Sequence, residues 1–193
     1  MAVAITLLVL DFVVPPPGST PHLGRTLGQE WPVYAAYLTS FITIGIIWIN
    51  HHVNISRLAQ ADHSILILNL FLLASIVVIP FGTDLLSSYL RESHGQDVAA
   101  AVYGGILLAM AVTFSLLNRQ ILLRRPHLLK TPLSLAERRA MFRRTATGVV
   151  PYAAATGLAA ASPYITLGIT AALAAFYATP LANLHPDKAD SSD

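Results

Sequence analysis

The stretch "WPVYAAYLTSFITIGIIWIN", residues 31–50, contains no charged side chain and is mostly apolar. A helix that crosses the hydrocarbon core of a bilayer needs about 20 such residues. Three more uncharged stretches follow, at residues 64–83, 98–118 and 145–186. The last is long enough for two crossings, and Ser162-Pro163 is a plausible turn between them because proline disfavours helix in the residue before it. The sequence therefore predicts five full-length membrane spans in an all-α fold.

The chain opens with a shorter apolar stretch, "MAVAITLLVLDFVV", residues 1–14. As a helix it reaches about 21 Å, against a hydrocarbon core of about 30 Å. A signal peptide would have a basic start and a small-residue cleavage site, and an interfacial helix would have a charged face. Neither pattern is present, because a triple proline follows and Asp11 is the one charged residue. We interpret the segment as a transmembrane helix without its first turns, through a late start assignment or a real truncation.

Together these stretches predict a polytopic membrane protein with six transmembrane helices per subunit, the first of them truncated. One transmembrane domain is expected over residues 1–186, with a linker at 119–144 and a tail at 187–193. Charged residues make up 11% of the chain, against about 25% in soluble domains. The lipid bilayer is thus the expected surrounding. The six expected spans cover roughly residues 1–14, 31–50, 63–86, 98–118, 145–161 and 164–182.

Lysine and arginine residues predict the orientation, because they concentrate in cytoplasmic loops. The 119–144 linker carries 8 of the 12 basic residues, Arg57 and Lys188 fall on the same side, and Arg25 and Arg91 on the other. We expect the linker and both termini in the cytoplasm of a multi-pass plasma-membrane protein. A nucleic-acid patch is the alternative interpretation of the linker, but beside membrane helices a topology signal is favoured. The segment "TPLSLAERRAMFRR" within it predicts a short surface helix.

The polar cluster "WINHHVN", residues 48–54, is the candidate for chemistry near the membrane. Two adjacent histidines on a helix point about 100° apart, so one helix wall cannot present both to one metal ion. The chain has no cysteine and no second cluster at ligand spacing, so neither a zinc nor a haem site is expected. Either the cluster caps the helix end, or it forms a network that fixes neighbouring helices. The residues of that candidate network are Trp48, Asn50, His51 and His52.

Three stretches resemble the transmembrane protein 175 family of lysosomal potassium and proton channels, in its prokaryotic six-helix branch. "AVAITLLVLDFVVP" is similar to the first helix of the family and "LTSFITIGIIWINHHVNISRL" to the second, with its tryptophan and paired histidines. "LILNLFLLASIVVIPFGTDLL" is similar to the third, so the resemblance covers about the first 90 residues. The family's first helix begins with an R-x-x-x-F-S-D motif. Met1 falls just after the place where that motif would end, so the expected helix starts part-way along.

The resemblance implies a tetramer in which the first helix of each subunit lines a central pore. Carried over by position, the apolar constriction falls on Val3, Leu7 and Leu10, where valine replaces an isoleucine and should widen its ring slightly. The i, i+4, i+7 spacing places the three on one helix face. Thr6 is the pore-adjacent hydroxyl, and Asp11 would lie at the extracellular mouth, where a carboxylate ring favours cations.

The resemblance thus implies a leak-type, potassium-preferring cation channel, a homotetramer with K⁺ as the permeant ion, no cofactor and no enzymatic activity. Mid-span ionisable residues are almost absent, which argues against a proton-coupled carrier. Two alternatives remain, a non-conducting membrane scaffold and a histidine-based membrane redox or metal protein. Leu8 lies about 100° around the helix from Leu7, so we expect a polar substitution there to leave conduction unchanged.

Overall fold

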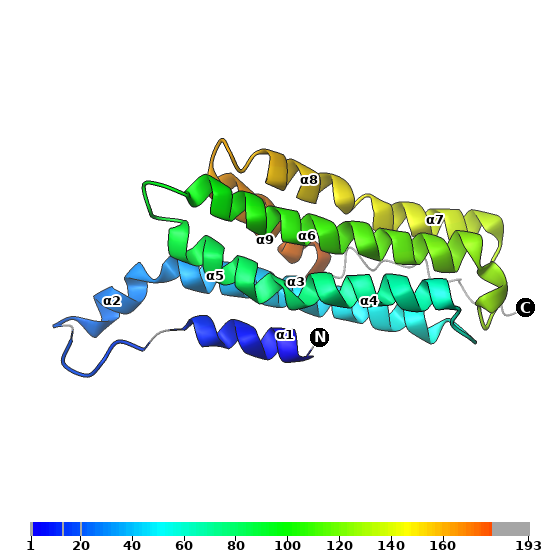
Figure 1. Cartoon of the computed structure of the whole chain (residues 1–193), viewed down its shortest axis with the longest axis horizontal. Helices are drawn as coiled ribbons and strands as arrows, with labels where there is room; N and C mark the ends of the chain where they lie inside the picture. Colours follow the sequence, from blue (N-terminus) through cyan, green and yellow to red (C-terminus); the bar gives the residue numbers. More distant parts are fainter. Residues whose placement is uncertain (1, 13, 20, 179–193) are drawn as a thin grey trace, which may run out of the picture.

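The computed structural model describes residues 2–12, 14–19 and 21–178, and over these ranges the chain is all-helical, without β-strands (Figure 1). The N-terminal part comprises α1 (Ala2–Leu7), the 3₁₀ turn η1 (Leu8–Asp11), α2 (Leu23–Gln29) and α3 (Trp31–Ser56). The middle comprises α4 (His63–Val77), α5 (Ile79–Tyr89), α6 (Gln96–Arg119) and the π-helical turn η2 (Gln120–Arg124). The C-terminal part comprises the 3₁₀ turn η3 (Pro126–Leu128), α7 (Leu135–Ala146), α8 (Val149–Gly157) and α9 (Pro163–Ala178).

Three helical stretches in the described ranges are long and apolar enough to cross a membrane. They are α3 with 26 residues, α4 and α5 together with 27, and α6 continued through η2 with 29. Helix α9 is apolar but has only 16 residues, and α8 has 9. The chain is therefore a multi-pass membrane protein.

Several helices differ in extent from the stretches expected on hydropathy. Helix α3 continues past residue 50 to Ser56, because the backbone hydrogen bonds of a helix do not require apolar side chains. The expected span over 63–86 is divided near Val78, two residues before Pro80. Proline lacks an N–H group and its ring clashes with the carbonyl four residues earlier, which explains the break. The end of the expected sixth span and the 187–193 tail lie outside the described residues.

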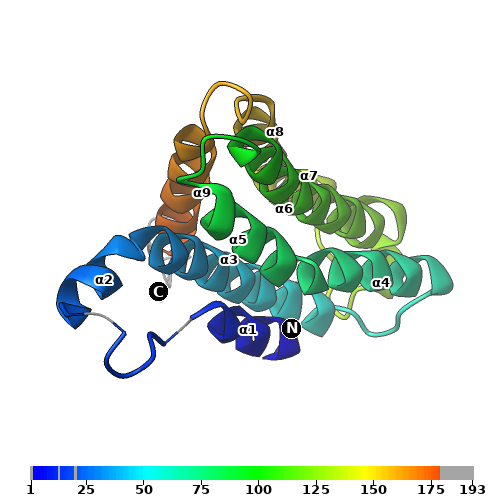
Figure 2. The same ribbon diagram turned by 60° about the vertical axis from the view of Figure 1, so that its left-hand side comes forward.

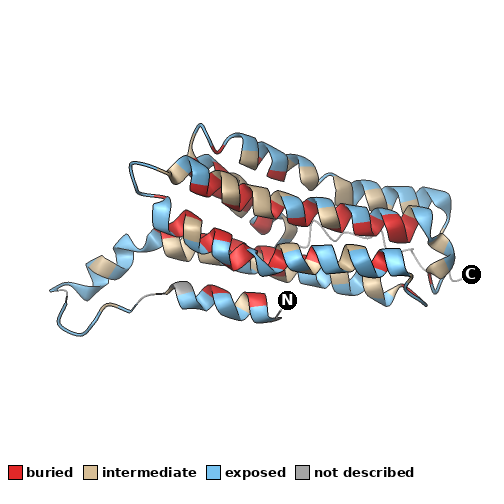
Figure 3. Cartoon of the chain, in the orientation of Figure 1, coloured by how far each residue is buried: buried red, intermediate tan, exposed pale blue. Residues whose placement is uncertain are grey.

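The helices lie roughly along the long axis of the molecule, with α1 at one border and α7 and α8 at the other (Figure 1). Helix α6 packs against α4, α5 and α8, and α9 packs against α3, α6 and α8 (Figure 2). Burial follows α6 most closely, because this helix has neighbours on several sides (Figure 3). Its fully buried side chains include Tyr103, Leu107 and Leu117.

Hydrogen bonds to loop and helix-end carbonyls mark the two ends of the bundle. At one end the loops after α3 and after η2 form an isolated antiparallel bridge between Leu58 and Leu129. The N–H of Ala59 donates to the carbonyl of Leu128 at 2.8 Å beside it. At the other end a guanidinium N–H of Arg91 donates to the carbonyl of Gln29 at 2.6 Å. The first end carries the residues of the basic linker, so we call it the basic end.

A buried hydroxyl cluster joins three helices in the middle of the bundle. Ser40 of α3 lies 2.7 Å from the hydroxyl of Thr83 on α5 and 3.0 Å from that of Tyr103 on α6. All three residues are buried. Hydrogen bonds of this kind hold helices together in a bilayer, where apolar burial between helices gives little driving force.

Candidate functional site

The first helix packs against the rest of the chain by one face. Ala4 and Leu8 are buried in the core, with exposed fractions of 1% and 0%. Ile5 is partly buried against the same cluster. Beyond η1, the ring of Phe12 lies between those of Tyr34 and Tyr37 on α3, with centroids 5.6 and 4.7 Å away. These contacts fix which face of the helix is turned outward.

The three residues proposed for the constriction lie on that outward face. The exposed fractions are 66% for Val3, 39% for Leu7 and 71% for Leu10. Leu7 ends α1 and Leu10 lies in the 3₁₀ turn, where side chains three residues apart are eclipsed. The structure thus brings the three together on one side of the first helix, directed away from the other helices.

Polar groups near this face are few. The hydroxyl of Thr6 donates to the carbonyl of Val3 at 2.9 Å, which leaves its oxygen lone pairs able to face a cation. Asp11 is the last residue of η1, and its side chain lies outside the described part of the chain. Val9, at 49% exposed, joins the outward face although the pattern did not single it out.

The structure shows Leu8 facing the rest of the chain and not outward, which bears on its use as a control. This side chain is fully buried against the body, so a polar substitution would place an amide or hydroxyl in the core. Such a change costs free energy of folding, of the order of 1–3 kcal/mol. Position 8 is therefore unsuitable as a neutral control for position 7.

The tryptophan and histidine cluster lies at the basic end of α3. The Nε2 of His51 donates to Oδ1 of Asn69 on α4 at 2.6 Å, a contact between two helices. Trp48 and His52 stack on one another within α3, with centroids 5.9 Å apart, and the amide of Asn50 donates to its own helix at Ile46. In the described ranges no three histidine, aspartate or glutamate side chains gather closely enough to hold a metal ion.

Comparison with known proteins identifies the family. Residues 1–80 match the family described as "Endosomal/lysosomal potassium channel TMEM175". A potassium channel of Streptomyces collinus is 41% identical over 176 residues, which cover 91% of this chain and 85% of that protein. The chain belongs to the TMEM175 family. The resemblance seen in the first three helices is confirmed.

Two further comparisons extend this similarity over the whole TMEM175-like fold. A potassium channel of Chamaesiphon minutus is 36% identical and covers 92% of this chain and 87% of that protein. The crystal structure of a lysosomal potassium-selective channel TMEM175 homolog from Chamaesiphon minutus matches with a TM-score of 0.81 at 35% identity. That match covers 95% of this chain and 92% of the other, so the helical arrangement is shared along nearly the full length.

Proposed function

We propose that this chain is the subunit of a leak-type, potassium-preferring cation channel whose pore is lined by the first helix. The observation that carries the proposal is the outward face of that helix, where Val3, Leu7 and Leu10 stay exposed while Ala4 and Leu8 hold the helix to the subunit. The names of the prokaryotic relatives support potassium as the permeant ion.

A single outward face cannot enclose a path for ions, so several copies must contribute it. We propose a homotetramer with six membrane-spanning segments per subunit, in which four copies of the first helix surround the axis. Its termini and basic end face the cytoplasm of the plasma membrane, in keeping with the positive-inside rule. The basic residues of the linker and of α7 support this orientation.

Selectivity in this proposal comes from the energy of ion dehydration. The chain has no carbonyl filter of the T-V-G-Y-G kind. An ion passing rings of valine and leucine loses hydration without a carbonyl cage that replaces it. K⁺ sheds its water more readily than Na⁺, so narrow apolar rings favour K⁺. Thr6 would offer an oxygen next to the narrowest ring.

The test compares two leucines of similar exposure. Leu7 is 39% exposed on α1, and Leu158 is 43% exposed at the end of α8, at the opposite border of the bundle (Figure 1). Leu7→Asn should wet the ring, raise cation flux and reduce the preference for K⁺ over Na⁺. Leu158→Asn should leave both quantities close to those of the unaltered protein. Liposomes holding the purified protein under K⁺ or Na⁺ gradients report both.

Three outcomes would overturn the proposal. Equal behaviour of the two asparagine variants would remove the first helix from the pore. Absence of flux from every variant would favour the non-conducting scaffold. A mass in nanodiscs corresponding to a monomer or dimer would exclude the tetramer.

A further inference from the structure

The end of α6 departs from α-helical geometry at the basic end. In the π turn η2 the N–H of Arg125 donates to the carbonyl of Gln120, five residues earlier, at 2.9 Å. Such turns are rare and frequently occur at functional sites. The widened turn brings Gln120, Arg124 and Arg125 opposite the beginning of α4.

An open-sided cavity of about 710 Å³ lies along the surface between these two elements. Its polar wall consists of Gln120, Arg124 and Arg125 on one side and of His63 and Ser64 on the other. All five side chains carry hydrogen-bond donors, and no carboxylate of the described residues lines the cavity. A ligand that accepts hydrogen bonds and carries negative charge matches this wall.

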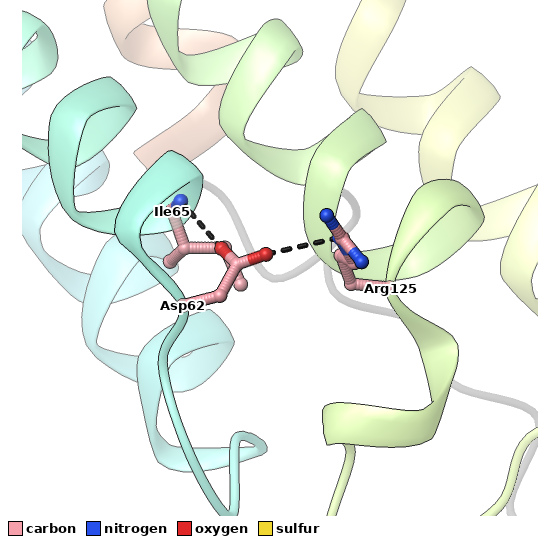
Figure 4. A network of polar contacts seen from close by, with 3 residues as sticks. All are labelled: Asp62, Ile65 and Arg125. Atoms are coloured by element: carbon pink, nitrogen blue, oxygen red, sulfur yellow. Dashed lines mark hydrogen bonds and ion pairs between the residues drawn. The ribbon is translucent and has the colours of Figure 1, made fainter.

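One arginine of the wall is held in place by a chain of polar contacts. An oxygen of Asp62 accepts the N–H of Ile65 at 2.8 Å, and its other oxygen lies 2.9 Å from Nε of Arg125 (Figure 4). Asp62 thereby caps α4 and fixes the guanidinium of Arg125, while it balances the charge of that residue. Arg124 is exposed and has no ion-pair partner among the residues that the structure describes. Its positive charge is therefore available to a ligand.

The same cavity has an apolar wall that distinguishes a lipid from a free anion. Ile67 and Leu68 line it, three and four residues after Ser64, and therefore on the same face of α4, one turn farther along the helix. Ile67 is 39% exposed. A ligand with phosphate at the basic end would thus continue along apolar side chains, as a phospholipid does. Clusters of arginine at the cytoplasmic ends of membrane helices attract anionic lipids.

We propose that this cavity binds an anionic phospholipid, with its phosphate at Arg124, Arg125 and Ser64 and an acyl chain along Ile67. The proposal concerns the groove between α4 and η2 and does not depend on the pore. Arg124 is the residue that supplies the uncompensated charge, and Arg125 is held ready by Asp62. Gln120, which is buried, closes the base of the site.

The experiment follows the thermal unfolding midpoint of the purified protein in detergent during titration with a lipid. Dioctanoyl phosphatidylglycerol should raise the midpoint, and dioctanoyl phosphatidylcholine should not. Arg124→Gln should require about fivefold more phosphatidylglycerol for the half-maximal shift, because one basic group near a membrane surface contributes about that factor. Arg139→Gln removes the same charge from an exposed position on α7, outside the cavity, and should leave the titration unchanged.

Any of three results of this titration would overturn the proposal. Equal shifts with the two lipids would show that charge plays no part. Equal weakening by both arginine variants would show diffuse attraction to the basic end instead of a site. The same shift with inorganic phosphate at low millimolar concentration would identify a binding site for the free ion and not for a lipid.

Discussion

Substitution by alanine should change the free energy of unfolding in opposite directions at two neighbouring glycines of α6, Gly104 and Gly105. A Cβ at Gly104 would lie 3.1 Å from the Cα of Thr156 on α8 and 2.9 Å from its Oγ1. That hydroxyl is bound to the carbonyl of Tyr152 at 2.8 Å, and the Cα belongs to the backbone, so the two helices must separate slightly. A Cβ at Gly105 meets nothing within 4 Å.

The magnitudes follow from two terms. Separation of tightly packed helices costs about 1–3 kcal/mol. Replacement of a mid-helix glycine by alanine contributes about 1 kcal/mol in the opposite direction at both positions. Gly105→Ala should therefore raise the free energy of unfolding by about 1 kcal/mol, and Gly104→Ala should lower it by about 0–2 kcal/mol. Since the helix-propensity term cancels, the two variants should differ by about 1–3 kcal/mol.

Thermal unfolding of the purified protein in detergent measures this difference. For a chain of this length, 1 kcal/mol corresponds to about 2–4 °C, so the midpoints should lie about 2–12 °C apart, with Gly105→Ala higher. Midpoints that coincide, or a higher midpoint for Gly104→Ala, would refute the close contact between α6 and α8.

Three further predictions concern other parts of the fold. Tyr103→Phe removes a buried hydroxyl from its contact with Ser40 and should lower the free energy of unfolding by about 0.6–1.7 kcal/mol, whereas Tyr164→Phe, at an exposed ring, should not change it. Ser134→Ala breaks the capping box with Glu137 and should cost about 1 kcal/mol; an unchanged unfolding midpoint would contradict this. A cysteine introduced by Ala140→Cys on α7 should not react with a membrane-impermeant thiol reagent added to intact cells, because α7 is expected to face the cytoplasm. Rapid labelling would show that the predicted orientation is wrong.

The sequence predicts the bodies of the long helices because length and hydropathy suffice for them. It misses their ends, as at Ser56, and the division near Pro80, which depends on how the helix accommodates a missing N–H group. The second half of the chain shows the same limit. Residues 145–186 are uncharged throughout, yet α8 ends at Gly157.

For the candidate site, periodicity groups Val3, Leu7 and Leu10 on one face but cannot say which face packs against the other helices. That information comes from tertiary packing, which buries Leu8. The cavity at the basic end could not be predicted from the sequence at all. It joins residues near 63 to residues near 120, and only the folded arrangement of α4 and η2 brings them together.

The first helix contacts the rest of the chain through few buried side chains, and this affects which substitutions it can accept. Only Ala4 and Leu8 of its described side chains are buried, whereas α6 buries 11 residues. Selection for correct folding therefore constrains the identity of residues in α6 strongly, whereas the outward positions of the first helix need only remain apolar enough for the membrane. A mutational library sorted by expression should tolerate many apolar residues at positions 3, 7 and 10. A much narrower set of tolerated residues there in a growth selection on limiting potassium is the result expected if these positions line the pore that we propose.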